Sequence, residues 1–401
     1  MAWFVLAALA ALGCSDDPSG TGGGDAGSAD GGGTDDAGSV DGGEAGDAGA
    51  IQVSLAPVSA QLRVGARETF TATVSGTADD GVAWDTSCGS VEVDGPRAVF
   101  TAPWEVVAGC TLTATSESDP SRRATAEIDT TVLSPHQLLP NPAFGEDIEG
   151  WFTYSDAGEP RAVWNEEDAT DATSGSAEIR HFLSGGNALV AGLRTECLPS
   201  TAGLAYHLGA SMRMLETAEN TELQVRIQSF DDAECSGENR VGTGEQISEA
   251  TSTEWTNAYQ TYTAPEGTTR IRISVGIFKP SGVDDDARAL IDNLFLYPQE
   301  PPPAEMEGSW AGMWGNGSAE PSAEWTLVLH PNGIYDVDTP GTDGAGVYWV
   351  SEGTLAGAHT YDSDTTFAIA AEVDDAFTRI EGTWGSPPEG TDGGSFYVDK
   401  Q

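Results

Sequence analysis

The chain has 401 residues, 64 acidic and 17 basic, and a formal net charge of −47. This length predicts two to four domains. The charge argues against nucleic-acid binding and against adsorption to anionic lipid, because both need a basic face. We expect a solvated acidic surface, and adaptation to salt or diffuse holding of divalent cations is the alternative.

Residues 1–13 form a short apolar run that ends just before Cys14. The run is too short to cross a membrane and has the length of a signal-peptide core. Ala11-Leu12-Gly13-Cys14 resembles the bacterial lipobox, in which the cysteine is lipidated and becomes the mature N-terminus. The resemblance implies lipidation at Cys14 and a membrane anchor in the cell envelope, as an outer-membrane lipoprotein exposed to the periplasm or the cell surface. An ordinary secretory signal is the alternative.

Residues 14–50 are predicted to be a disordered tether. Between residues 15 and 50 there are 13 glycines, nine acids and no basic residue, so nothing can form a core. A Gly-rich coil of this length reaches about 30–36 Å, and its expected role is to hold the folded domains away from the membrane.

Four further cysteines fall two by two within the proposed domains. Four cysteines allow three pairings, and the domain layout favours Cys88–Cys110 and Cys197–Cys235. Disulfides imply an oxidising compartment outside the cytoplasm.

Residues 51–133 contain short segments that alternate apolar and polar residues, which predicts β-strands. Asp94-Gly95 is a hairpin signal. The segment, with Trp84 and the cysteines, resembles bacterial Ig-like domains. We expect a sandwich that serves as a spacer, with adhesion as the alternative.

Residues 138–297 carry the main functional prediction. Three segments, 206–213, 223–228 and 270–278, place apolar residues on one side and polar residues on the other. This alternation predicts antiparallel sheets packed on one face, as in a sandwich or jelly roll. Of the 15 arginines, nine lie between Arg161 and Arg288.

Rows of guanidinium and amide groups can bind hydroxyls or carboxylates, and aromatic faces add apolar contact with a sugar ring. The alternative is that the arginines pair with the abundant acids on a solvated face. The candidate ligand-binding residues are Tyr154, Trp164, Arg180, Arg213, Gln224, Arg226, Gln228 and Arg272.

Several motifs of this segment resemble those of carbohydrate-binding modules in cellulases and xylanases, which are galactose-binding-like jelly rolls. The motifs are Asn141-Pro142-Ala143-Phe144 followed by Gly150-Trp151, Thr253-Glu254-Trp255, and Ile291-Asp292-Asn293-Leu294. The resemblance implies polysaccharide or a cell-surface glycan as the partner. It also implies a structural calcium held by Asp292, with Glu146 near the start of the domain as the second ligand.

Residues 298–305 form a proline-rich linker, and residues 306–401 contain further short strands. One strand is expected over Tyr348–Leu355, and Pro331-Asn332-Gly333 is a hairpin signal. The pattern predicts an up-and-down barrel. The segment resembles lipocalin-like domains, and such a barrel either holds a small apolar ligand or has a filled core.

No catalytic motif is present. The five histidines are scattered, none stands in an H-E-x-x-H or nucleophile-elbow context, and no phosphate-binding loop is found. The sequence therefore predicts an all-β, monomeric, non-catalytic glycan-binding lipoprotein. A structural or adhesive envelope protein is the alternative, and a glycoside hydrolase accessory protein is a further one.

Overall fold

The computed structural model describes residues 50–401 except 156–161, 171–173, 183–188, 218–219, 238–239, 352, 362, 364 and 388–389. The predicted signal peptide, the predicted lipidation site Cys14 and nearly all of the predicted tether lie outside the described residues. Within the described part the fold is all-β, as predicted, and its one helix is a single 3-10 turn, η1 (Ala304–Met306). No helix in this part is long and apolar enough to cross a membrane.

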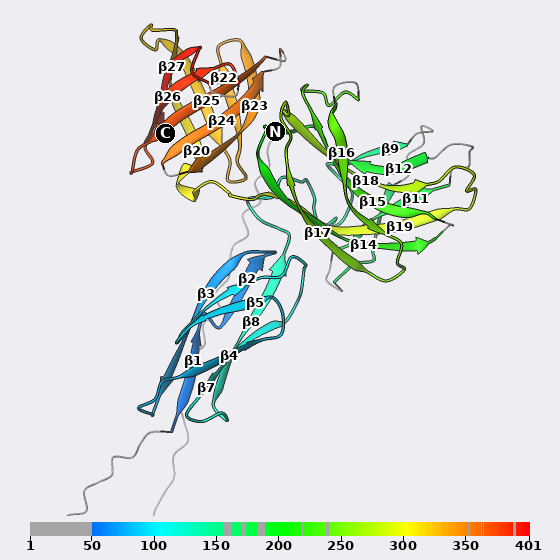
Figure 1. The fold of residues 1–401 in the computed structure, drawn as a ribbon, viewed down its shortest axis with the longest axis vertical. Coiled ribbons are helices and arrows are strands. Elements are labelled where there is room, and N and C mark those ends of the chain that lie inside the picture. Colours follow the sequence, from blue (N-terminus) through cyan, green and yellow to red (C-terminus); the bar gives the residue numbers. More distant parts are fainter. Residues whose placement is uncertain are drawn as a thin grey trace, which may run out of the picture. The chain divides into compact units, whose positions relative to one another are not determined.

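The N-terminal strands form two four-stranded sheets, β1-β3-β6-β5 and β2-β8-β7-β4 (Figure 1). Phe70, Phe100 and Ile128 are fully buried in the shared core. The predicted Cys88–Cys110 disulfide is present. The strands are β1 (Gln52–Ala56), β2 (Ser59–Arg63), β3 (Arg67–Ser75), β4 (Val82–Thr86), β5 (Ser90–Asp94), β6 (Arg97–Thr101), β7 (Cys110–Ser116) and β8 (Arg123–Thr131).

The central strands form a five-stranded sheet, β10-β11-β19-β14-β17, and a larger sheet ordered β16-β15-β18-β12-β9, with β13 paired to β18. Their apolar faces share one core, and the predicted Cys197–Cys235 disulfide is present. The strands are β9 (Phe152–Ser155), β10 (Ala162–Asn165), β11 (Ser176–His181), β12 (Leu189–Arg194), β13 (Leu198–Pro199), β14 (Ala205–Glu216), β15 (Glu222–Phe230), β16 (Arg240–Ala250), β17 (Thr256–Thr263), β18 (Arg270–Lys279) and β19 (Ala287–Pro298).

The predicted inward faces of this sandwich are confirmed. Leu223, Val225 and Ile227 of β15 are buried, as are the β-branched residues at alternate positions of β18. The sheets therefore bury one face each and leave the other face for side chains of different chemistry.

The C-terminal strands close into an eight-stranded barrel in which each strand pairs with the next and β27 pairs with β20. One expectation was wrong: Tyr348–Leu355 is not one strand. Gly353 adopts a positive φ of 80° and makes the turn between β23 and β24. The strands are β20 (Gly308–Asn316), β21 (Ala323–Leu329), β22 (Ile334–Thr339), β23 (Thr342–Ser351), β24 (Thr354–Tyr361), β25 (Thr366–Val373), β26 (Arg379–Gly385) and β27 (Gly394–Lys400).

Candidate functional site

The eight predicted ligand-binding residues do not form one surface. Strand order places three of them on the five-stranded sheet and five on the sheet of β16-β15-β18-β12-β9. Since the two sheets pack through their apolar faces, their polar faces point away from each other. The first group is Trp164, Arg180 and Arg213, and the second is Tyr154, Gln224, Arg226, Gln228 and Arg272.

Arg180 belongs to a buried ion-pair network. Its Nε donates to the carboxylate of Glu178 at 2.7 Å, and Arg288 contacts the same carboxylate at 2.6 Å. Asn165 donates a third hydrogen bond to Glu178 at 3.0 Å. Burial raises the pKa of Glu178, but these hydrogen bonds outweigh it and lower the pKa to about 2. Arg180 is thus committed to a structural partner.

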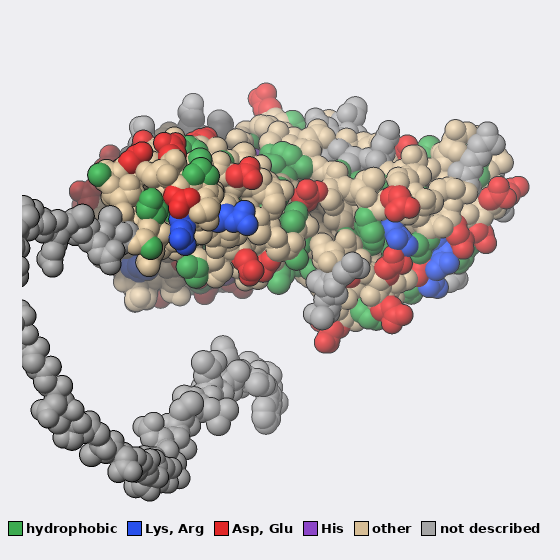
Figure 2. Space-filling model, turned by 90° about the horizontal axis from the view of Figure 1, so that it is seen from below, with side chains coloured by type: hydrophobic (Ala, Val, Ile, Leu, Met, Phe, Trp, Pro, Cys, Tyr) green, Lys and Arg blue, Asp and Glu red, His purple; other side chains and the backbone are tan. Residues whose placement is uncertain are grey.

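Arg213 and Trp164 also have partners on this sheet. Arg213 forms an ion pair with Glu167 at 2.7 Å and lies over the ring of Trp255. Trp164 is 38% exposed, and its indole nitrogen donates to the Phe144 carbonyl at 2.7 Å. On the face shown in Figure 2, the few Lys and Arg side chains lie beside Asp and Glu side chains. The alternative of arginines paired with acids therefore describes Arg180 and Arg213.

On the polar face of the β16-β15-β18-β12-β9 sheet, Gly192 and Gly276 form a flat area without side chains, which we call the glycine floor. Gly192 of β12 lies opposite Gly276 of β18, with Gln224 and Tyr154 at the two ends of the same row. A Cβ atom on Gly276 would lie 2.7 Å from the Tyr154 hydroxyl, so the phenol reaches across the glycines. Glycine at this place lets an aromatic ring lie flat against the sheet.

Arginine side chains stand beside this floor. Arg272 donates to the Cys235 carbonyl at 3.3 Å and to Gln228 at 3.4 Å, and lies over the ring of Phe230. Burial, and then the charges of Arg194 and Arg240, lower the pKa of Arg272. Arg194, Arg240 and Arg272 therefore lie near enough on this face for their charges to interact.

Several polar atoms on this face are buried without a hydrogen-bond partner in the described part of the chain. They are Nε of Arg226, Nε of Arg272 and Oε1 of Gln224. The amide nitrogen of Gln224 does have a partner, the carboxylate of Glu222. Buried polar groups are normally paired, so on this outward-facing sheet the two Nε–H groups can donate to a ligand and Oε1 of Gln224 can accept from it.

A cavity of about 230 Å³ opens at the edge of this face. Of the residues that line it, only Arg272 was a predicted ligand-binding residue. The residues that the sequence did not single out for binding include Phe152, which is 47% exposed, and Arg194, which lies over the Tyr154 ring at 6.0 Å. The short apolar run 189–193 followed by an arginine was a usable strand signal for Arg194. The cavity is lined by Phe152, Arg194, Thr195, Glu196, Cys197, Glu234 and Arg272.

This cavity offers three kinds of contact side by side. Guanidinium groups only donate hydrogen bonds, carboxylates only accept them, and the exposed ring of Phe152 offers an apolar face. A hydroxyl group donates and accepts, so a ligand with several hydroxyls on a ring can satisfy all three.

The two predicted calcium ligands, Asp292 and Glu146, differ in their burial. Asp292 is fully buried and accepts N–H bonds from Ala169 and Asn293, whereas Glu146 is exposed. Burial, with a further contribution from the negative charge of Asp168, raises the pKa of Asp292 to about 7, although the N–H bonds from Ala169 and Asn293 lower it. Asp168, rather than Glu146, is the carboxylate that interacts with Asp292.

The carboxylates of buried Asp292 and half-buried Asp168 repel each other, and a bound cation would offset this repulsion. Among the described residues, no three His, Cys, Asp or Glu side chains gather in a metal-binding group. A calcium ion here would therefore need backbone carbonyls and water as its other ligands, which this ion accepts.

No family model and no curated protein matches this chain. Among solved structures, the CBM22-1–GH10 modules of a Clostridium thermocellum xylanase, complexed with xylohexaose, are 15% identical with a TM-score of 0.29. That match covers 41% of this chain and 29% of the other, so the chain spans less than a third of that structure.

Two further structures are carbohydrate-binding modules. One, from a structural study of promiscuous specificity in modules of the β-sandwich superfamily, is 13% identical with a TM-score of 0.32, covering 61% of this chain and 97% of the other. The CBM22-1–CBM22-2 tandem of Paenibacillus barcinonensis Xyn10C is 12% identical with a TM-score of 0.30, covering 68% and 92%. These likenesses concern the β-sandwich fold.

Proposed function

We propose that this protein is a non-catalytic, carbohydrate-binding lipoprotein of a bacterial envelope. Its central sandwich binds a sugar chain on the polar face of the β16-β15-β18-β12-β9 sheet. The observation that carries the proposal is the cavity in which an exposed phenylalanine, two arginines and two glutamates meet beside the glycine floor.

The lining charges favour a neutral sugar. Arg194 and Arg272 are matched in number by Glu196 and Glu234, so neither sign dominates the cavity. At about 230 Å³ it is smaller than the roughly 300–1,000 Å³ of pockets that enclose a drug-sized molecule. One unit of the chain would occupy the cavity, and its neighbours would lie over Tyr154 and the glycine floor.

A glycan array with the full chain tests this function. We expect binding to neutral polysaccharides or oligosaccharides, with weaker signals on uronic-acid polymers because the protein carries a charge of −47. No binding to any glycan, with calcium or with chelator, would reject the proposal and leave the structural or adhesive role.

The anchor is proposed from the sequence around Cys14. Palmitate labelling of the chain in a Gram-negative host is expected to modify the wild type and not Cys14→Ser. Release of an unlabelled wild-type protein into the medium would refute lipidation and leave an ordinary secretory signal.

We further propose a structural calcium held by Asp292 and Asp168. Calcium is expected to raise the melting temperature above that measured in chelator, because a ligand at 100 times its Kd stabilises the folded state by about 2.7 kcal/mol. Asp292→Asn should lose this shift.

Glu146→Gln is the matched variant for the calcium experiment, since the sequence places Glu146 in the site and the structure leaves it exposed. The variant should keep the full calcium shift. Loss of the calcium-induced shift in Glu146→Gln would show that Glu146 is a calcium ligand, as the sequence predicts. Absence of the shift in the wild type would refute the calcium site.

A further inference from the structure

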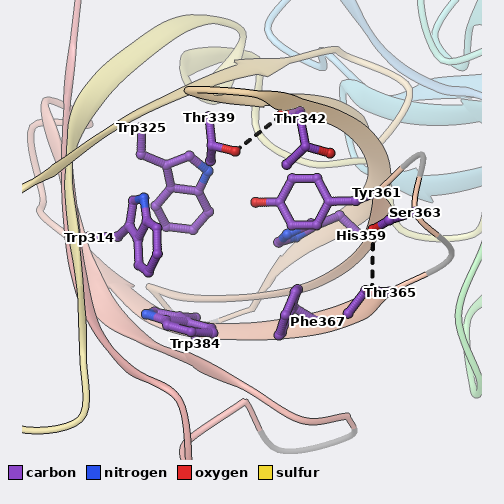
Figure 3. Close-up of a pocket in the computed structure, with 10 residues that line it drawn as sticks. All are labelled: Trp314, Trp325, Thr339, Thr342, His359, Tyr361, Ser363, Thr365, Phe367 and Trp384. Atoms are coloured by element: carbon purple, nitrogen blue, oxygen red, sulfur yellow. Dashed lines mark hydrogen bonds between the residues drawn. The ribbon is translucent and has the colours of Figure 1, made fainter.

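One end of the C-terminal barrel encloses a cavity of about 270 Å³ (Figure 3). It lies where β20, β22, β24 and β26 end and β21, β23 and β25 begin. Its walls are mainly aromatic: Trp314, Trp325, Tyr361, Phe367 and Trp384. The volume is almost twice the approximately 150 Å³ of a cavity that admits benzene.

Elsewhere in the described part of the barrel, side chains pack into a core. Trp310, Tyr335 and Leu355 are buried in its core, and Met306 of η1 is fully buried against them. Large and small residues alternate along the inner face, as Leu355, Gly357 and His359 do on β24. The space is therefore confined to one end, where aromatic edges and faces surround it.

Two indole N–H groups at this cavity lack an acceptor. Nε1 of Trp314 and Nε1 of Trp325 are buried and have no hydrogen-bond partner within the described residues. Trp325 as a whole is only 4% exposed. Nε1 of Trp384, by contrast, donates to the Gly315 carbonyl at 3.0 Å. A buried donor without a partner costs free energy, because it has lost its hydrogen bonds to water. A ligand that supplies an acceptor would offset this cost.

The orientation of these groups fits such a ligand. In Figure 3 the indole nitrogen of Trp325 and the hydroxyl of Tyr361 face each other across the cavity. The rings of Trp314 and Trp384 meet edge to face with centroids 5.3 Å apart, as do those of Phe367 and Trp384. Aromatic walls at right angles to one another offer both ring faces and ring edges to an aromatic ligand.

The described residues that line the cavity carry no charge at neutral pH. None of them is Asp, Glu, Lys or Arg. Burial, and then the charge of Arg270, lower the pKa of His359 to about 3, and its Nδ1 is hydrogen-bonded to the Tyr335 hydroxyl at 2.6 Å. An ionised ligand would lose its hydration without gaining an opposite charge.

We propose that this cavity binds a neutral, planar, one- or two-ring aromatic compound whose carbonyl oxygen accepts the free indole N–H groups of Trp325 and Trp314. Such a ligand fills the apolar cavity and supplies the missing hydrogen-bond acceptor. This binding is independent of the carbohydrate face.

The probe is coumarin, a neutral two-ring lactone, and naphthalene is its counterpart without an acceptor. Isothermal titration calorimetry on the full chain is expected to show at least tenfold tighter binding of coumarin. Trp325→Phe should reduce this preference, and Trp325→Phe combined with Trp314→Phe should bring the two affinities within about threefold of each other, because both free donors are gone while aromatic rings remain. Trp384→Phe is the matched control. It makes the same change of side chain, but the N–H group that it removes already has an acceptor, so the preference for coumarin should remain.

Ser363→Trp, at an exposed lining position, should weaken both ligands by obstructing the cavity. If Trp325→Phe does not fold, as judged by circular dichroism, Trp314→Phe makes the same comparison at a less buried residue. Absence of coumarin binding at millimolar concentration overturns the proposal. Equal affinities in the wild type, or a preference that survives removal of the indole donors, also overturns it.

Discussion

Glu178→Gln is expected to lower the free energy of unfolding of the central sandwich by about 3 kcal/mol at pH 7. Glu178 is buried, and Arg180, Asn165 and Arg288 all donate to its carboxylate. Its pKa in the folded protein is about 2, below the ordinary value of 4.5. The stabilisation is therefore complete above about pH 4.5 and is lost as the pH falls toward 2. The difference in free energy of unfolding between the wild type and Glu178→Gln should therefore become smaller over this pH range.

The measurement must report on this domain, because separate domains need not unfold together. Hydrogen exchange of peptides from β11 and β19 during a urea titration gives such a local readout. Glu167→Gln is the control, since it breaks an ion pair of the same 2.7 Å length to Arg213 but at a side chain that is 40% exposed. A loss of no more than about 1 kcal/mol is expected there. Equal losses in the two variants would show that burial of the Glu178 network contributes nothing.

Phe152→Ala and Arg194→Ala are each expected to weaken glycan binding at least about tenfold, equivalent to about 1.4 kcal/mol. Phe152 offers an exposed ring at the cavity, and Arg194 is an exposed donor beside it. Neither substitution disturbs the buried core, so the melting temperature should change little. Titration calorimetry with the strongest array ligand measures the effect.

Arg213→Ala is the matched control for this experiment. The sequence placed Arg213 in the same site as Arg272, but the structure places it on the other sheet, paired with Glu167. Its affinity should equal that of the wild type. Loss of binding in Arg213→Ala, with Phe152→Ala unaffected, would move the site to the five-stranded sheet.

The sequence by itself determined the strands and their buried faces. Alternation along 223–228 and 270–278 identifies the inward residues because a strand repeats every two residues, whatever it pairs with. The two disulfide pairings followed from the domain layout and are present. The turn at Gly353 was missed although the polar run Ser351-Glu352-Gly353-Thr354 is a usable turn signal.

Only the tertiary structure decided which polar residues share a surface. Alternation says that Arg213 and Arg226 both point outward, but not that β14 and β15 belong to opposite sheets. Strand order comes from long-range pairing, which leaves no local trace in the sequence. The same reason explains why Asp168, rather than Glu146, interacts with Asp292. It also explains why Phe152 and Arg194, which belong to different strands, line one cavity. Trp314 and Trp325, whose indole N–H groups have no partner among the described residues, are likewise brought to one cavity only when eight strands close into a barrel.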